Sequence, residues 1–321
     1  MITNFSVDNA GILRKSDQPL AQALWIDLFS PTPEERLTLL QEANIIVPTH
    51  HETYQLEFSN RFYEKNNALY LSVNVITRVA PTPEIHTVTF ILTQDRLVTL
   101  RFTDPNPIKT FIEHIPYHPM AVQNHWDIFF VILKNIIGRV ADIFEIFEIK
   151  TDQLSQTLKY AIHREAKPKK PGILNQTLSE INNLENILSE CYGSLSSLRL
   201  LSSYLHHTRS TLFSEQLLKQ FETIDQDITV LFGLAEYITQ KLEFQLEFTL
   251  GLINLDQTYI IKIFTVLAMI FMPPTLIASI YGMNFRVMPE LHFAWGYPLA
   301  LALMIITAFI PYRYFKRRGW I

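Results

Sequence analysis

The stretch that decides the fold is Tyr281-Gly282-Met283-Asn284-Phe285, which stands between two long apolar runs. The run before it, 263–281, has 19 residues without a charge, and the run after it, 293–312, has 20. At a rise of about 1.5 Å per residue, each run matches a hydrocarbon core about 30 Å thick. We therefore predict two membrane-spanning helices, 263–281 and 293–315, joined by the loop 282–292, in preference to a buried hairpin of a soluble core.

The charges around these runs predict how the chain lies in a membrane. Up to position 260 the chain has 21 basic and 30 acidic residues, whereas beyond it there are six basic residues and one acid. Three of the basic residues lie in the tail 316–321, and the cytoplasmic side of a membrane protein collects Lys and Arg. Residues 1–20 show no signal-peptide pattern. We expect both termini to be cytoplasmic and only the loop to face outside.

Composition excludes several classes of protein. Only 9 residues are glycine, and none belongs to a phosphate-binding GxGxxG or GxxxxGK[ST] loop, so a nucleotide-driven enzyme is not predicted. The acidic balance of the first 260 residues gives little attraction for nucleic acid. The single cysteine, Cys191, is interpreted as a buried apolar residue. His50-His51, His206-His207 and the pair His114 and His118 are poorly spaced for zinc. No catalytic set stands out, and we expect no enzyme.

The first 121 residues are predicted to form a cytoplasmic α/β domain. A helix is expected from Pro33, because Ser30 or Thr32 can supply the capping oxygen and acidic residues favour the first turn. Runs rich in β-branched and aromatic residues predict strands at 23–28, 68–77, 86–92 and 96–102.

From about Val122 to position 281 the pattern is helical. A hairpin is predicted over 122–213, broken at 166–172, where two prolines and a glycine interrupt a continuous helix. The next helix, 214–281, has no proline before Pro273 and would be 68 residues, or roughly 100 Å, long. Such a length is typical of a stalk that continues into the first membrane span and packs against copies of itself.

The loop between the spans carries a family resemblance. Gly282-Met283-Asn284 ends the first span, Met288-Pro289-Glu290-Leu291 follows, and a basic end closes the chain. In these features, and more loosely at Trp25-Ile26-Asp27-Leu28, the chain resembles the CorA family of bacterial magnesium channels over nearly its whole length. The resemblance implies a homopentameric channel of the bacterial inner membrane, with Mg²⁺ as cargo and intracellular regulator. Co²⁺ and Ni²⁺ are further candidate cargo.

The resemblance places an ion selectivity filter at Gly282, Met283 and Asn284, and the chemistry of the ion agrees. Mg²⁺ prefers six oxygen ligands and gives up its waters reluctantly, so neutral acceptors such as the Asn284 amide oxygen suit the hydrated ion. Gly282 lets the backbone leave the helix, and Met283 is expected to pack against a neighbouring chain. A plain Gly-Asn helix cap is the simpler interpretation of the same residues.

Helical spacing back from Asn284 gives a stripe of pore-lining candidates on one face of the long helix. On a shared axis, its polar members would form hydrated sites separated by a hydrophobic constriction. Threonine hydroxyls that bond their own helix backbone explain the polar members equally well. The candidates are Glu247, Asn254, Thr258, Ile261, Phe264 (or Thr265), Ala268, Met272, Thr275 and Ser279.

Two residues depart from the family pattern. Arg286 stands where the family often has an acid, and Glu290 in the outer loop offsets its positive charge only in part. Thr258 stands where the family often has asparagine. Asp225, Asp227 and Glu247 on the stalk are candidates for a regulatory Mg²⁺ between subunits.

Two other functions stay open at this point. One is a zinc transporter of the sister branch, against which the Met-Pro-Glu-Leu sequence argues. The other is a membrane-anchored helical scaffold, in which the Gly-Asn turn would be incidental.

Overall fold

The chain forms two compact units in the computed structural model, one made of residues 1–157 and 178–245 and the other of 158–177 and 246–321. The structure describes residues 1–16, 19–54, 61–78, 84–163, 171–209, 213–286, 288–289 and 293–320.

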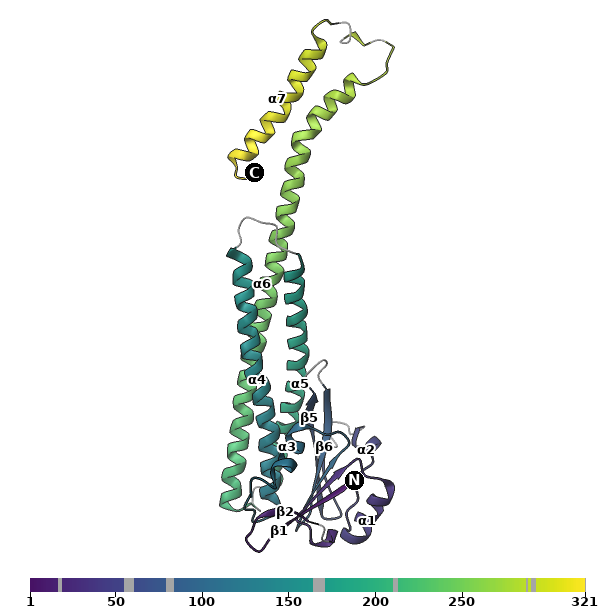
Figure 1. The fold of residues 1–321 in the computed structure, drawn as a ribbon, viewed down its shortest axis with the longest axis vertical. Helices are drawn as coiled ribbons and strands as arrows, with labels where there is room; N and C mark the ends of the chain where they lie inside the picture. Colours follow the sequence, from purple (N-terminus) through teal and green to yellow (C-terminus); the bar gives the residue numbers. More distant parts are fainter. Residues whose placement is uncertain are drawn as a thin grey trace. The chain divides into compact units, whose positions relative to one another are not determined.

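A seven-stranded sheet is the centre of the first unit (Figure 1). Its order is β2-β1-β3-β7-β6-β5-β4; β3 and β7 are parallel, and the other paired neighbours are antiparallel. Asn66 and Asn67, both at positive φ, join β4 to β5 in the two-residue turn that suits a twisted hairpin. The strands are β1 Ile2–Val7, β2 Leu13–Ser16, β3 Trp25–Phe29, β4 Phe62–Lys65, β5 Ala68–Arg78, β6 Glu84–Leu92 and β7 Leu97–Arg101.

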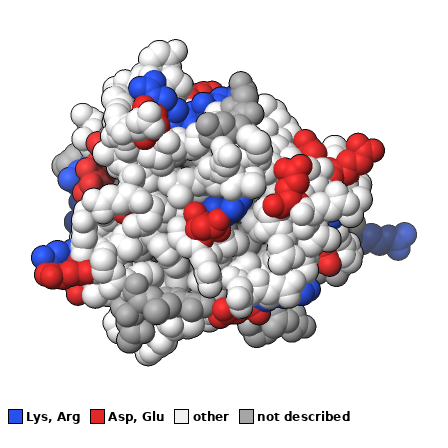
Figure 2. Space-filling model, turned by 90° about the horizontal axis from the view of Figure 1, so that it is seen from below, with Lys and Arg blue, Asp and Glu red and all other residues white. Residues whose placement is uncertain are grey.

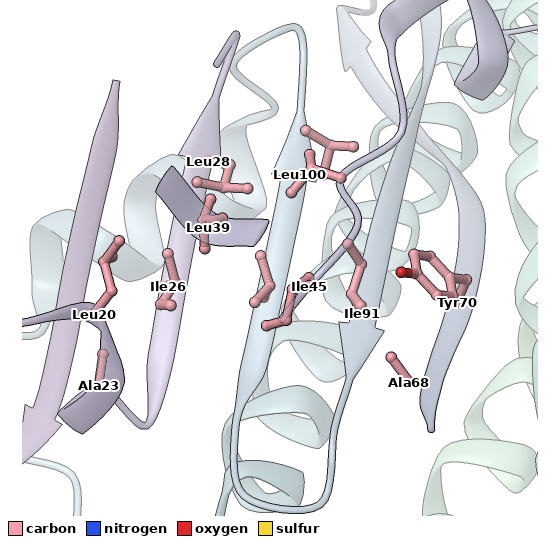
Figure 3. Close-up of a cluster of buried hydrophobic side chains, with 12 residues drawn as sticks. Leu20, Ala23, Ile26, Leu28, Leu39, Ile45, Ala68, Tyr70, Ile91 and Leu100 are labelled. Atoms are coloured by element: carbon pink, nitrogen blue, oxygen red, sulfur yellow. The ribbon is translucent and has the colours of Figure 1, made fainter. Parts of the chain in front are cut away.

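One face of the sheet is covered by the 3-10 helix η1 (Leu20–Gln22) and by α1 (Pro33–Ala43). Leu39 of α1 is fully buried with Leu28 of β3 in the cluster that Figure 3 draws. The Thr32 hydroxyl accepts from the Glu35 backbone and the Glu35 carboxylate accepts from the Thr32 backbone, so Thr32, and not Ser30, caps α1. The short helix α2 (His50–Tyr54) follows.

The other face of the sheet packs on α3 (Asn106–His114), α4 (His125–His163) and α5 (Pro171–Arg209). The ring of Phe90 in β6 meets that of Phe129 in α4 edge-on, with centroids 5.2 Å apart. The Ser194 hydroxyl in α5 donates to the Asn74 carbonyl of β5 over 2.8 Å. The sheet is therefore the middle layer of an α/β/α arrangement.

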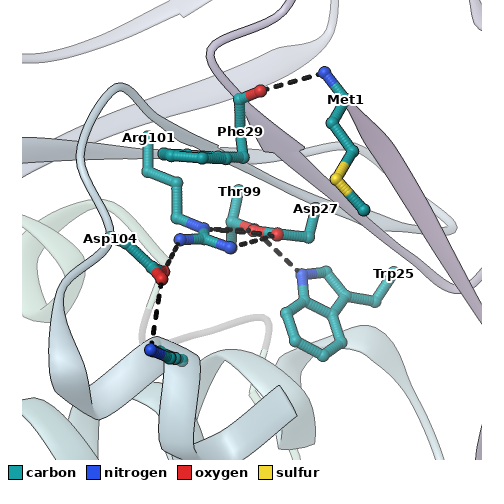
Figure 4. A network of polar contacts seen from close by, with 8 residues as sticks. Met1, Trp25, Asp27, Phe29, Thr99, Arg101 and Asp104 are labelled. Atoms are coloured by element: carbon teal, nitrogen blue, oxygen red, sulfur yellow. Dashed lines mark hydrogen bonds and ion pairs between the residues drawn. The ribbon is translucent and has the colours of Figure 1, made fainter. Parts of the chain in front are cut away.

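A buried polar network lies on this second face (Figure 4). The Arg101 guanidinium donates to the Asp27 carboxylate, with Nη2 and Oδ2 3.0 Å apart, and also pairs with Asp104. The Thr99 hydroxyl donates to Asp27 over 2.7 Å and accepts from the Trp25 indole over 3.1 Å. These bonds join the parallel strands β3 and β7 through their side chains.

The long helix α6 (Glu215–Tyr281) carries a heptad seam over its first half. Buried residues recur at alternating intervals of four and three, which is the period of a coiled coil. The seam packs against the chain's own helices: Gln245 donates to the Thr151 carbonyl of α4, and Asp225 accepts from Ser202 of α5. We predicted that the stalk packs against copies of itself. In the structure, α4 and α5 of the same chain cover this seam instead. The seam residues are Leu217, Phe221, Ile224, Ile228, Leu231, Ala235, Ile238, Leu242, Gln245, Thr249 and Leu252.

The second unit contains the two helices that are long and apolar enough to cross a membrane, the C-terminal part of α6 and α7 (Gly296–Arg317). Their apolar windows are 6% and 11% buried, so these side chains face outward and do not form the core of a soluble domain. The α6 helix runs unbroken through Pro273 and Pro274, and its last turns curve (Figure 1). The two prolines remove two backbone donors, but the helix does not end there.

The element boundaries differ from the predicted ones at several points. The second span begins at Gly296, not at 293, and it continues through Lys316 and Arg317, which we assigned to the tail. Two cations in the last turn suit the negative end of a helix dipole. The predicted break at 166–172 falls mostly on residues outside those described, but α4 ends at His163 and α5 begins at Pro171. Strands β1, β2 and β4 and helices α2 and α3 were not predicted.

Acidic and basic residues are scattered over the end of the molecule that Figure 2 shows, and most of that face is uncharged. A continuous basic surface of the kind that binds nucleic acid is not seen on this face.

Candidate ion-conduction site

The predicted stripe follows one face of α6 within the second unit, where this helix is exposed on nearly all sides. From Glu247 to Ser279 its predicted members are exposed, and Ile261, Phe264 and Met272 keep 64%, 66% and 67% of their surface. The opposite side of the helix holds the buried Leu252 and Val266. Large apolar side chains outside the stripe are exposed too, among them Leu255 and Tyr259 at 65% and 58%. So much exposed apolar surface around a helix needs lipid or other protein to cover it.

The polar members of the stripe keep oxygen acceptors available. The Thr258 hydroxyl donates to the Asn254 carbonyl over 2.8 Å, and the Thr275 hydroxyl donates to the Phe271 carbonyl over 2.7 Å. This is the bond to the helix backbone that a hydroxyl makes in an apolar setting. It uses the single donor of each threonine and leaves the oxygen lone pairs facing outward. Water molecules around a cation point their hydrogens outward, so such lone pairs are suitable partners for a hydrated ion.

Part of the stripe lines a shallow groove on α6. Four predicted residues, Ala268, Met272, Thr275 and Ser279, line this groove together with Phe271 and Leu276. The groove lies on the last turns of the helix, next to the Gly-Met-Asn segment. The structure thus brings together the outer half of the stripe as one surface, while the inner members follow it along the same helix face.

Gly282 ends the helix without the left-handed backbone that a glycine cap normally uses. Its N–H donates to the Ala278 carbonyl over 2.9 Å, and the Met283 N–H donates to the Ile280 carbonyl over 3.3 Å. Neither Gly282 nor Asn284 has a positive φ, so the simple Gly-Asn cap is wrong. What restricts the position is space, because a Cβ at Gly282 would lie 3.1 Å from the Ala278 carbonyl oxygen.

The residues predicted to form the filter are open to their surroundings. Met283 keeps 45% of its surface and Phe285 keeps 67%, and Asn284 and Arg286 between and beyond them are also exposed. Met288 and Pro289 are described, but Glu290 lies outside the described residues.

The regulatory candidates do not form a metal site in one chain. Asp225 is exposed, but its carboxylate accepts from the Ser202 hydroxyl over 2.8 Å, while Asp227 and Glu247 are exposed. Across the described residues, nowhere do three His, Cys, Asp or Glu side chains gather as they would around a metal ion. This holds for His114 and His118 too, whose rings pack edge to face 5.7 Å apart.

Comparison with known proteins agrees with this two-span architecture. Residues 21–317 match the family described as CorA-like Mg²⁺ transporter protein. The chain belongs to the CorA family. It is 32% identical to the magnesium transport protein CorA of Pasteurella multocida and 31% identical to that of Escherichia coli K12, in each case over 100% of both chains.

Solved structures of low sequence identity share the CorA fold. The complete CorA magnesium transporter of Methanocaldococcus jannaschii aligns over 100% of this chain and 99% of its own, with a TM-score of 0.79 at 20% identity. The full-length CmaX protein aligns over 99% of this chain and 97% of its own, with a TM-score of 0.72 at 15% identity. The α/β domain, the long helix and the two C-terminal apolar helices are therefore the CorA architecture.

Some residues that shape the molecule were not found from sequence. Arg101 and Thr99 were assigned only to a strand, although they hold Asp27 in the buried network. A charged residue within an apolar strand was the available signal, because a buried charge needs a partner. That partner lies 74 positions away, and only the parallel β3–β7 pairing brings the two together.

Proposed function

We propose that the chain carries Mg²⁺ across the cytoplasmic membrane as a homopentameric channel. Membership of the CorA family and full-length relatives named magnesium transport protein support Mg²⁺ as the cargo. The observation that carries the channel assignment is the exposed stripe of α6, which alternates oxygen acceptors with large apolar side chains and leads to Gly282-Met283-Asn284.

Several chains are needed to make this surface a pore. A single helix offers one row of acceptors, and the exposed apolar members of the row are stable only when covered. In a ring of five copies, the α6 stripes would face a common axis, where Asn254, Thr258, Thr275 and Ser279 would contact a hydrated ion. The α7 helices would then face the lipid.

Selection would take place at the outer mouth. The Asn284 amide offers a neutral oxygen to the waters of the ion, so Mg²⁺ can enter without losing its tightly held hydration shell. The Gly282 backbone places this residue just beyond the last helical turn. Co²⁺ and Ni²⁺ are proposed as further cargo.

Gating would take place along the apolar part of the stripe. Ile261, Phe264 and Met272 would form a constriction that excludes water when the helices are close together and admits it when they separate. Intracellular Mg²⁺ bound between the cytoplasmic domains would favour the closed arrangement. Both termini and the α/β domain are placed in the cytoplasm, and the loop after α6 on the outer side.

Mg²⁺ uptake by the purified protein in liposomes tests this function. We expect uptake by the parent protein and none by Asn284→Ala, which removes the amide oxygen but leaves helix packing and assembly intact. Gly282→Ala should fail as well, because its Cβ would press on the Ala278 carbonyl oxygen. Asn284→Gln keeps the amide one methylene away and is the matched control for acceptor chemistry.

Assembly is measured on the same samples by mass photometry or light scattering. Asn284→Ala transport at the parental rate would show that the filter lies elsewhere. Uptake of Zn²⁺ without Mg²⁺ uptake would place the chain with the zinc transporters, and no uptake of either ion by a correctly assembled oligomer would favour a scaffold.

A further inference from the structure

A cleft of about 660 Å³ separates α3 from α4 in the first unit and has no part in the proposed channel. One wall is a single face of α3, where Asn106, Thr110 and His114 recur at intervals of four. The other wall is a single face of α4 with Lys134, Gly138 and Arg139. The size falls within the range of about 300–1,000 Å³ that small-molecule sites occupy.

Gly138 shows that the floor of this cleft is open. It lies inside α4, where glycine destabilises a helix relative to alanine. Its φ is not positive, and a Cβ built there meets nothing within 4 Å. Gly233 and Gly251 in α6 are equally open, so an unhindered glycine does not by itself indicate a ligand. At Gly138 the missing side chain adds room on the floor of the cleft.

The charge of the cleft is opposite to that of its surroundings. The first 260 residues carry more acids than bases, yet two cations, Lys134 and Arg139, line this cleft with one acid, Asp142. Arg139 is half-buried. Among the residues described, no carboxylate lies within salt-bridge distance of Lys134 or Arg139. A half-buried guanidinium without a counter-ion is a suitable partner for a phosphate, which it can bind through two parallel hydrogen bonds.

The walls also offer groups for a larger ligand than a bare anion. The amide of Asn135 and the hydroxyl of Thr110 line the cleft with donors and acceptors. Phe111 and Met120 add an apolar surface beside them. This combination of cationic, neutral polar and apolar groups suits an anion that carries an organic part.

We propose that the α3–α4 cleft binds an organic phosphate of the nucleoside diphosphate or triphosphate class. Arg139 and Lys134 bind the phosphates, and the organic part lies over Gly138 against Phe111. The site is built by two helix faces and needs no glycine-rich loop, which is why motif analysis did not find it. It is independent of the proposed channel function, because none of its residues lies on α6 or α7.

Isothermal titration calorimetry on the full-length protein in detergent tests the site. ADP and ATP are titrated in Mg²⁺-free buffer with EDTA, alongside inorganic phosphate and adenosine. We expect saturable binding of ADP and ATP by the parent protein, and at least tenfold weaker binding of phosphate and adenosine. Arg139→Gln and Lys134→Gln should each lower the affinity for ADP at least tenfold. Lys159→Gln, an exposed lysine of α4 outside the cleft, is the charge-matched control and should bind like the parent.

Two variants of one residue test the position of the ligand. Gly138→Ala should keep binding, because one methyl group occupies little of the cleft, whereas Gly138→Leu should abolish it while the circular dichroism spectrum stays that of the parent. Binding of ADP by Gly138→Leu at the parental affinity would overturn the proposal. So would phosphate binding as tight as that of ADP, which would mean a plain anion site. The proposal would also be overturned if the parent protein did not bind ADP and Gly138→Leu formed a smaller oligomer. That result would mean that a second copy of the chain occupies the cleft.

Discussion

At the scale of single residues, the Asp27–Arg101 pair shows how the α/β domain depends on buried charge. Asp27 keeps 2% of its surface and Arg101 7%, and two further groups bond to the pair, the Thr99 hydroxyl to Asp27 and the Asp104 carboxylate to Arg101. Burial by itself lowers the pKa of Arg101, but the hydrogen bond and charge of Asp27 outweigh it, so the pKa of Arg101 is raised above its usual value. Arg101 is thus charged at neutral pH.

Asp27→Asn should destabilise the first unit by about 3 kcal/mol, since breaking one side of a buried pair leaves a charge with too few partners. Asp104 still contacts Arg101 in this variant, so the loss of stability should lie at the lower end of the range for a broken buried ion pair. The measurement is chemical denaturation of the full-length protein in detergent, followed by tryptophan fluorescence. Glu215→Gln removes an exposed carboxylate that pairs with Lys219 and should leave the midpoint unchanged. Equal effects of the two substitutions would contradict the argument.

Cys191 gives a prediction about pH. The side chain is fully buried, and burial, with a smaller contribution from the Glu190 charge, raises the pKa of its thiol to about 12. A raised thiol pKa means that the reactive thiolate is absent at pH values well above the ordinary thiol pKa of about 8.5. We expect no reaction with a maleimide at about pH 8.5 in the folded protein. Reaction should be complete after denaturation, and labelling of the native protein would show that Cys191 is accessible.

At the scale of elements, sequence patterns predicted what is local and missed what depends on distant partners. The apolar runs of α6 and α7 specify their helices by themselves, because a membrane-spanning helix satisfies its own backbone. Strands β3, β5, β6 and β7 were predicted because their runs of β-branched and aromatic residues reflect burial in the sheet.

Strand β4, at the edge of the sheet, shows why other elements were missed. Its four residues are exposed or half-buried and exist as a strand only through pairing with β5. The partner of the heptad seam on α6 also could not be predicted, because the 3.5-residue period is the same whether the other helices belong to the same chain or to a copy. The stripe on α6 follows from the helical period, which is a local property, and its pore-lining role stays a prediction.

The α6 stripe supports a prediction about gating. Met272→Asn replaces an exposed apolar member, 67% exposed, by a side chain that binds water. If the stripe lines a constriction that dewets, the substitution hydrates it and should increase Mg²⁺ uptake severalfold at internal Mg²⁺ levels that close the parent channel. Stopped-flow uptake into liposomes preloaded with Mg²⁺ measures this effect. Val266→Asn, on the opposite and buried side of the helix, is the control, and it should impair folding or assembly without opening the channel.

At the scale of the whole molecule, the distribution of charge predicts topology. The loop after α6 is proposed to be the outer segment, with both termini in the cytoplasm. Cysteine introduced at Arg286 or Glu290 should react with a membrane-impermeant maleimide in intact cells, and cysteine introduced at Arg318 should react only after the membrane is permeabilised. The native Cys191 is buried and gives no background signal. Labelling at position 318 in intact cells would contradict the proposed orientation.

Regulation by internal Mg²⁺ is the other proposed property of the proposed pentamer. Each soluble part has 21 basic and 30 acidic residues, so five of them around an axis would repel one another unless cations lie between them. Within one chain, the described acids do not gather into a metal site, so a regulatory ion would need carboxylates from two subunits. Mg²⁺ bound in this way stabilises only the arrangement in which the subunits are close, which is the proposed closed state.

Neutralising the candidate acids together tests this mechanism. Asp225→Asn, Asp227→Asn and Glu247→Gln in one variant lower both the repulsion and the affinity for a bridging ion, so the channel should be inhibited less by internal Mg²⁺. The first measurement is uptake as a function of internal Mg²⁺. The second is protease protection of the full-length protein in Mg²⁺ and in Na⁺ of matched ionic strength, because general screening of charge acts equally in both salts. The control, Glu34→Gln with Glu42→Gln, removes two exposed acids of α1 and should keep the parental inhibition. Equal protection by the two salts would exclude a bridging ion, and loss of inhibition in the control alone would place the sensor on the α/β domain.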